Sequence, residues 1–421
     1  MRRPTRDSIE GIRPISRNLS LDLIAAIGVG VTGAMVASLL PTIARRGGLE
    51  PLGLAALAAA PFLANLLGVF SGRLGPRSPR QFALLRLIGA GALVTLPFLP
   101  TPPVIIAATM VFWLSLSFSS PFQLRLWGTT YPARMRGRVV GFLGTGRAAA
   151  AAMAALTGGI LADRLGGPTV IAVAGVVGAL CALAYAGFRA SAASVPLAYS
   201  ARQSIRALRA RPMLVRVALA QGFFGGGFIA AGPLFALVNV DRLDLSLSDV
   251  GVIGVLSASA TMLSFLAWGV VADRFGSLTP MRIGSFIGLC GLLGYALAPN
   301  VGVVWLAAVA IGTSSSSIEI GIAAIISDHT SLVDRAAAMS GWNAVTGARG
   351  LIAPFVMSGL VQAGAVEVTT ALLVCVGATA IGVALFWRAA RQARADDEAR
   401  RFASPAVSTA AVPAAPAAPG A

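Results

Sequence analysis

The chain has 421 residues, of which 56% are hydrophobic and only 12% charged, and its formal net charge is +17. A soluble globular protein has about 25% charged residues, so this composition excludes a water-soluble protein and indicates a membrane protein. The positive charge does not indicate a nucleic-acid partner. All 33 basic residues are arginines, and they cluster in short gaps between apolar runs and in the two tails.

A helix needs about 20 apolar residues to cross the hydrocarbon core of a bilayer. Twelve such runs predict an all-α polytopic membrane protein with twelve transmembrane helices. The first run is longer than the core of a signal peptide, which is about 7–15 residues, so we expect it to be retained. The predicted spans are 19–43, 51–71, 82–100, 103–124, 139–162, 168–188, 213–238, 247–272, 280–298, 301–327, 336–362 and 366–388.

The arginines also predict the orientation. Most of them fall in the N-tail, the C-tail and every second loop, and the intervening loops hold only Arg45, Arg46, Arg164 and Arg242. Arg-rich loops stay cytoplasmic. We therefore expect a multi-pass protein of the plasma (cell inner) membrane with both termini in the cytoplasm.

A polar, basic segment at 189–212 interrupts the succession of spans, and Leu197, Ile205 and Leu208 predict a helix lying on the membrane surface there. The tail after Arg401 is rich in proline and alanine, which predicts disorder. The expected organisation is an N-tail at 1–18, a six-helix bundle at 19–188, a cytoplasmic linker at 189–212, a second six-helix bundle at 213–388 and a cytoplasmic tail at 389–421.

One octet, G-x-x-x-D-R-x-G, recurs at the ends of spans. Full copies are GILADRLG at Gly159–Gly166 and GVVADRFG at Gly269–Gly276. A third copy, at Gly68–Gly75, is damaged, because Gly72 stands in place of the aspartate. An eroded fourth copy begins at Gly359. The first residues of the four copies are 91, 110 and 90 positions apart. A three-helix unit therefore occurs four times, and the two units within each half have opposite orientations in the membrane.

With this repeat, the sequence resembles the major facilitator superfamily over residues 19–388. The resemblance implies the fold of that family, two six-helix bundles built as 3+3 inverted repeats. It also implies that the loops after helices two and eight latch a cytoplasmic gate in the outward-facing state. The alternative is that they are positively charged turns with no gating role. The gating residues implied are Gly68, Arg73, Gly75, Gly269, Asp273, Arg274 and Gly276.

The residue types of the octet also allow local predictions. Gly269 is expected to let two helices approach closely, and Gly276 to permit the turn. Asp273 is expected to cap a neighbouring helix or to pair with an arginine.

Charged side chains inside predicted spans are the candidates for a transport path, because buried charges usually face a cavity or a partner. Glu319 lies about 13 Å into the membrane at ~1.5 Å per residue, and Arg147 lies at similar depth. The resemblance places helices one, four, seven and ten around a central cavity. The substrate and coupling candidates are Glu319, Arg349, Arg147, Arg125, Gln123, Gln221 and Asn343.

Glu319 is the expected coupling group, which would exchange a proton when the cavity opens to either face. The alternative is an ion pair between Glu319 and Arg349 that only fixes the packing of helices ten and eleven. Asp22 is expected to be a cap or a headgroup contact at the cytoplasmic end of helix one.

Other classes of site find no support. Cys181, Cys290 and Cys375 lie far apart and His329 is the sole histidine, so we expect neither a disulfide framework nor a metal site. GVGVTG at Gly28–Gly33 lies in mid-helix and predicts close helix packing, not a dinucleotide site. A chain without lysine has no Walker A motif. We expect no cofactor and no enzyme activity.

The sequence thus predicts a secondary active transporter that moves a small solute by alternating access, with proton-coupled efflux of amphipathic or drug-like compounds as the first interpretation. Arg125, Arg147 and Arg349 favour an alternative, the uptake or exchange of an organic anion. A non-transporting scaffold or sensor is the remaining alternative. The expected partners are a small-molecule substrate, protons and the lipid bilayer, without nucleic acid, and the expected state is a monomer.

Overall fold

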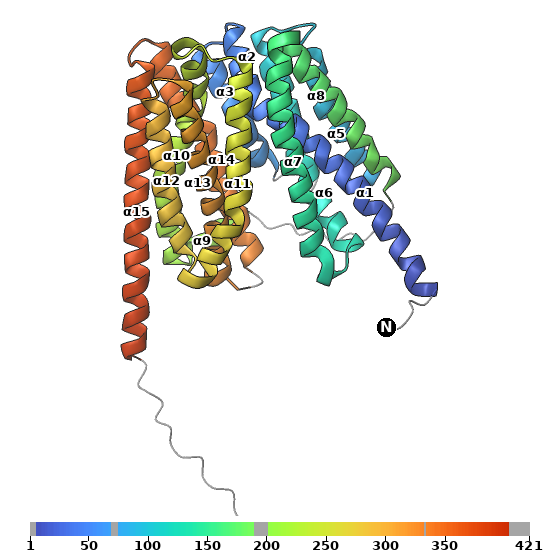
Figure 1. Cartoon of the computed structure of the whole chain (residues 1–421). Coiled ribbons are helices and arrows are strands. Elements are labelled where there is room, and N and C mark those ends of the chain that lie inside the picture. Colours follow the sequence, from blue (N-terminus) through green and yellow to red (C-terminus); the bar gives the residue numbers. More distant parts are fainter. Residues whose placement is uncertain (1–5, 69–74, 189–200, 332–333, 404–421) are drawn as a thin grey trace, which may run out of the picture.

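The computed structural model describes residues 6–68, 75–188, 201–331 and 334–403. Every regular element in these residues is helical, and none is a strand. The long helices run side by side in one bundle (Figure 1). The beginning of the first helix and the end of the last lie at the same end of this bundle, here called the terminus end, and the opposite end is called the far end.

Six helical spans form the N-half, which we define as residues 6–188. In the first span, α1 (Arg6–Ala34) continues through the π-helical turn η1 (Met35–Leu39) into α2 (Leu40–Arg46). The others are α3 (Pro51–Leu67), α5 (Pro79–Ala92) with the short turn η3 (Leu93–Thr95), α6 (Pro102–Thr130), α7 (Ala133–Leu165), and α8 (Gly167–Ala182) with η4 (Leu183–Gly187).

The C-half, residues 201–403, begins with the short helix α9 (Ala201–Arg209). Its spans are α10 (Pro212–Leu237) with η5 (Val238–Arg242), α11 (Leu247–Phe275), α12 (Leu278–Ala296), α13 (Val301–His329), α14 (Arg335–Gln362) and α15 (Val368–Ala403). α9 packs on α14, where the Leu208 side chain and the Ser204 backbone lie against Gly341. The expected linker helix is therefore present, whereas Leu197 lies outside the described residues.

Among the described residues, nine helical segments are long and apolar enough to cross a membrane. The other three predicted spans coincide with α3, α5 and α12, which fall outside that set. The structure thus confirms an all-α polytopic membrane protein, while the number twelve depends partly on these three helices. The last helix differs from expectation, because α15 continues to Ala403, well beyond the predicted end at 388.

Local sequence explains where several helices begin and end. α3, α5, α6 and α10 each have proline in the first turn, where its missing N–H costs no hydrogen bond. The octets end α7 and α11. Gly166 and Gly276 have φ angles of +87° and +86°, in the left-handed region that favours glycine. The prediction that Gly276 permits the turn is confirmed.

Small residues bring helices together inside the N-half. A Cβ on Gly28 would collide with the Cys181 side chain of α8, and one on Gly30 would collide with the Arg147 carbonyl of α7. The interpretation of GVGVTG as a close-packing motif is therefore confirmed.

The largest contacts between the two halves are made by two helix pairs, α7 with α11 and α3 with α14. A Cβ on Gly159 would collide with the Leu247 carbonyl at the start of α11, and one on Gly350 of α14 would collide with the ring of Phe62. α7 and α11 are close at the far end and diverge toward the terminus end (Figure 1). The close approach of these two helices is thus confined to the far end.

Candidate functional site

Polar contacts between the halves reinforce the far end. Asp163 of α7 accepts hydrogen bonds from the backbone N–H groups of Leu247 at 2.9 Å and Ser248 at 2.8 Å, and from the Ser248 hydroxyl at 2.6 Å. Asp163 thereby caps the N-terminus of α11, where two backbone donors have no partner within the helix. The aspartate of the second octet therefore joins the two halves.

Three further contacts lie at the same end. Arg45 and Asp241 form an ion pair of 2.8 Å between α2 and η5. Arg46 lies 3.9 Å from Asp163 and donates a hydrogen bond to the Leu245 carbonyl. Gln362 of α14 donates to Glu50 at 2.6 Å and accepts from the Leu52 N–H at 2.9 Å. We call these contacts and the Asp163 cap the far-end latch.

The octet at Gly269–Gly276 lies at the terminus end and has no comparable contact. Asp273 is exposed, and within the described part of the chain no hydrogen bond or ion pair joins it to a partner. A Cβ on Gly269 would meet nothing within 4 Å, so the prediction that this glycine brings two helices together is wrong in this structure. Gly68 and Gly75 are described, whereas Arg73 lies outside the described residues.

A cavity of about 420 Å³ lies among α1, α3, α5, α6 and α7. Trp113, Trp127 and Leu116 give it apolar walls, and its polar residues come from four helices, with three from α6 and one each from α3, α5 and α7. Those polar residues are Asn65, Arg86, Ser117, Ser120, Gln123 and Arg147. The structure thus brings Gln123 and Arg147, two of the predicted site residues, to one cavity.

Beside this cavity, Asp22 is completely buried and accepts three side-chain hydrogen bonds (0% exposed). Trp127 donates from Nε1 at 3.2 Å, and the Tyr131 and Tyr185 hydroxyls also donate. An ionised carboxylate is an acceptor only, which suits a site faced by three donors. The expectation that Asp22 caps a helix or touches headgroups is therefore wrong, because these aromatic residues enclose it.

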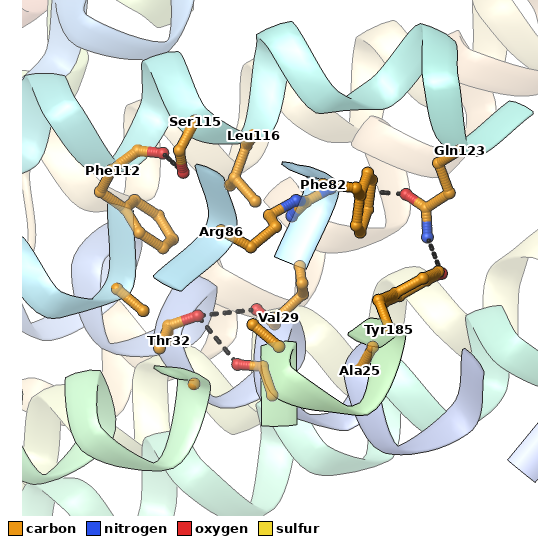
Figure 2. A pocket seen from close by; sticks show the side chains of 14 residues that line it. Ala25, Val29, Thr32, Phe82, Arg86, Phe112, Ser115, Leu116, Gln123 and Tyr185 are labelled. Atoms are coloured by element: carbon orange, nitrogen blue, oxygen red, sulfur yellow. Dashed lines mark hydrogen bonds between the residues drawn. The ribbon is translucent and has the colours of Figure 1, made fainter. Parts of the chain in front are cut away.

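Tyr185, a member of this cluster, fixes the orientation of Gln123 through a hydrogen bond between the two side chains (Figure 2). The hydroxyl proton of Tyr185 is used by Asp22, so the Tyr185 oxygen must accept, and Gln123 donates to it from Nε2 at 3.0 Å. The amide oxygen of Gln123 then faces Arg86, whose Nη2 donates at 3.4 Å. The three hydrogen bonds thus form a series in which Arg86 donates to Gln123, Gln123 donates to Tyr185 and Tyr185 donates to Asp22.

Arg86 is the residue that the sequence analysis missed. It lies seven residues into α5, about 10 Å from the start of the helix at ~1.5 Å per residue, and only 9% of it is exposed. It also lines a smaller cavity of about 30 Å³ with Thr32, Ser115 and Tyr185 (Figure 2). The signal for it in the sequence is an arginine inside the apolar run at 82–100.

The remaining candidates lie elsewhere. Arg349 of α14 donates a hydrogen bond to the Gln221 carbonyl of α10, and Gly225 leaves room for its guanidinium. No ion pair joins Arg349 to Glu319, although both side chains are described. Asn343 is exposed on α14, and the Arg125 side chain lies outside the described part.

Glu319 lies on an exposed face of α13. Ser316 of α13 contacts Ser264 of α11 at 2.7 Å, and Ser314 and Ser317 lie against glycines of α12. Ser315 and Glu319, four residues apart and so on one face, are both exposed.

The fold and the cavity can now be compared with known proteins. The sequence profile described as Major Facilitator Superfamily matches residues 23–331 and 217–417. The chain belongs to the major facilitator superfamily. No curated protein sequence matches it significantly.

Solved structures of superfamily transporters resemble the chain along nearly its whole length. The nucleoside transporter NupG has a TM-score of 0.71 at 12% identity, over 89% of this chain and 98% of that one. A bacterial homologue of the human lysosomal transporter Spinster, inward-facing and unoccupied, has a TM-score of 0.69 at 14% identity, over 90% and 97%. An auto-inhibited POT family peptide transporter has a TM-score of 0.64 at 13% identity, over 91% and 97%. At these identities the likeness concerns the fold.

Proposed function

We propose that this superfamily member is a secondary active transporter that moves a small amphipathic solute by alternating access. The observation that carries the proposal is the far-end latch. It closes one end of the interface between the halves, while α7 and α11 diverge toward the other end. Two halves whose facing helices α7 and α11 diverge from one end can rock against each other and expose a cavity to each side in turn.

The cavity of about 420 Å³ supports the size and character of the solute. Trp113 and Trp127 offer flat apolar surfaces, and Gln123 and Arg147 offer hydrogen-bond donors. A few polar groups in a largely apolar cavity are typical of small-molecule sites. Efflux of such compounds is our first proposal. Uptake or exchange of an organic anion is the second, because the described charged residues on the cavity wall, Arg86 and Arg147, are both cationic.

Coupling to protons is part of the proposal, with Glu319 as the coupling group. Glu319 is an exposed carboxylate inside a membrane span and forms no ion pair with a described residue. Carboxylates within membrane spans are typical of the proton relays of transporters. A chain without lysine also has no Walker A motif with which to use ATP directly.

The arginine distribution supports a location in the plasma membrane with both termini cytoplasmic. In that orientation, the far end is extracytoplasmic and this structure is inward-facing. Reporter fusions after Arg206 and Arg391 should then read cytoplasmic, and a fusion near Asp244 external. An external C-terminal fusion would contradict the orientation.

Transport itself is tested in proteoliposomes under an imposed pH gradient. Two amphipathic fluorescent solutes serve as probes, the cation ethidium and the anion fluorescein. Protein-dependent movement of either probe, abolished when the gradient is dissipated, is the expected result. Movement of neither probe, with no solute-dependent proton flux, would favour a non-transporting scaffold or sensor.

A further inference from the structure

Arg86 is a buried cation whose charge is not matched locally. Its Nε and Nη1 atoms are buried and form no hydrogen bond, and its Nη2 makes only the 3.4 Å contact with Gln123. No described carboxylate forms an ion pair with it. The remaining partner is the Phe82 ring, whose centroid lies 5.2 Å from the guanidinium carbon.

Such an arrangement is unfavourable in the absence of a ligand. A buried guanidinium loses its hydration, and buried charges are normally paired with an opposite charge. Asp22 does not supply this charge directly, because its oxygens already accept from Trp127, Tyr131 and Tyr185. The orientation of Gln123 adds one acceptor, and the other donors of Arg86 stay unused.

Arg86 also lies where a solute could reach it. It is part of the wall of the cavity of about 420 Å³ as well as that of the pocket of about 30 Å³. The smaller pocket exceeds the roughly 10–15 Å³ that a water molecule needs, so it can hold a single polar group but not a solute. Arg147 adds a second positive charge to the wall of the larger cavity.

We propose that Arg86 binds an anionic group of the transported solute, a carboxylate or a phosphate, whose apolar remainder lies against Trp113 and Trp127. The planar guanidinium offers two parallel N–H donors to such a group. Gln123, held by Tyr185, positions the guanidinium from the opposite side. This inference rests on the proposed transport function and names its substrate class as amphipathic organic anions.

Binding to the purified full-length protein tests this without requiring transport. The probes are benzoate, phenylacetate and phenyl phosphate, with benzamide and phenylacetamide as uncharged counterparts. Binding is followed by tryptophan fluorescence and by the thermal unfolding midpoint. We expect the anions to bind and to raise the midpoint, and the amides to have little effect.

Arg86→Met should weaken anion binding by about tenfold or more, because it removes hydrogen bonds to a charged group. It should leave the midpoint of the ligand-free protein unchanged or higher, because it removes an unmatched buried charge. A purely structural arginine would instead lower that midpoint. Arg138→Met, at an exposed position of α7 outside the cavity wall, is the matched control and should change neither property.

If Arg86→Met cannot be purified, Arg86→Lys keeps the charge without the planar donor pair and should bind anions more weakly than the wild type. Equal binding of anions and amides, or no binding of any anion, would overturn the proposal. An anion affinity equal to that of the wild type in either Arg86 variant would also overturn the proposal. Transport of ethidium alone would overturn the proposed substrate class and leave the proposed transport function standing. Anion binding without any transport would overturn the transport function and leave the anion site standing.

Discussion

Asp163 accepts two hydrogen bonds from Ser248, one from its backbone N–H at 2.8 Å and one from its hydroxyl at 2.6 Å, although the two residues are 85 positions apart in the sequence and belong to different halves. One residue ends α7 and the other begins α11. An aspartate at a helix N-terminus satisfies free backbone donors and interacts favourably with the helix dipole. This contact exists only while the far end is closed.

Asp163→Ala should therefore favour opening of the far end. An N-cap contributes about 0.5–2 kcal/mol, so the open population should rise by roughly 2- to 30-fold, since 1.4 kcal/mol corresponds to about tenfold. The measurement is the rate at which a membrane-impermeant maleimide labels Ser38→Cys, which lies between the halves at this end, in a background without Cys181, Cys290 and Cys375.

Asp273→Asn is the matched control, because Asp273 makes no such contact here. It should not raise the labelling rate, but it should impair transport if its loop latches the opposite state. The contacts of Asp163 at the far end lead us to expect effects of opposite direction on the population of the open far end. Equal labelling rates in the two variants would contradict this account.

Asp22→Ala should lower thermal stability. It leaves the donors of Trp127, Tyr131 and Tyr185 without their acceptor, at about 1–3 kcal/mol for each buried group. Asp22→Asn should be milder, because its amide oxygen still accepts. The thermal unfolding midpoints of both variants are measured in detergent. Asp328→Ala, which changes an exposed aspartate, is the control. A midpoint for Asp22→Ala equal to that of the control would mean that the cluster contributes nothing to stability.

Glu319→Gln should abolish accumulation driven by a pH gradient and retain solute binding, since it removes the titrating group at nearly constant size. Adding Arg349→Met should not restore transport, because Arg349 donates to the Gln221 carbonyl and forms no ion pair with Glu319. Transport and thermal midpoint are measured together. Normal gradient-dependent transport by Glu319→Gln would end the coupling hypothesis.

The fold could be predicted from the sequence to within a few residues for most spans, because apolar length and terminal prolines and glycines act locally. The structure begins α10 at Pro212 and ends α14 at Gln362, against predicted bounds of 213 and 362. The end of α15 was missed, because a charged amphipathic sequence can continue a helix beyond the membrane.

The site was less predictable, because it depends on which side chains meet. Arg147 was identified from its depth in the membrane and Gln123 from the family resemblance, which places helix four at the central cavity, and both line the cavity. Asp22 was misjudged, since nothing in its neighbourhood in the sequence points to Tyr131 or Tyr185, more than a hundred residues away. The repeats indicated the octets, but not which copy would hold the halves together in this state.

The most direct test of alternating access is a disulfide across the far end. A Cβ on Gly254 would lie 3.4 Å from the Cβ of Ser38, close to the mean of about 3.8 Å in disulfides. In the background without native cysteines, Ser38→Cys/Gly254→Cys should bind solute but move none in proteoliposomes while oxidised, and a reducing agent should restore movement. Each single-cysteine variant should transport normally under both oxidising and reducing conditions. Undiminished transport by the fully oxidised pair would contradict the account.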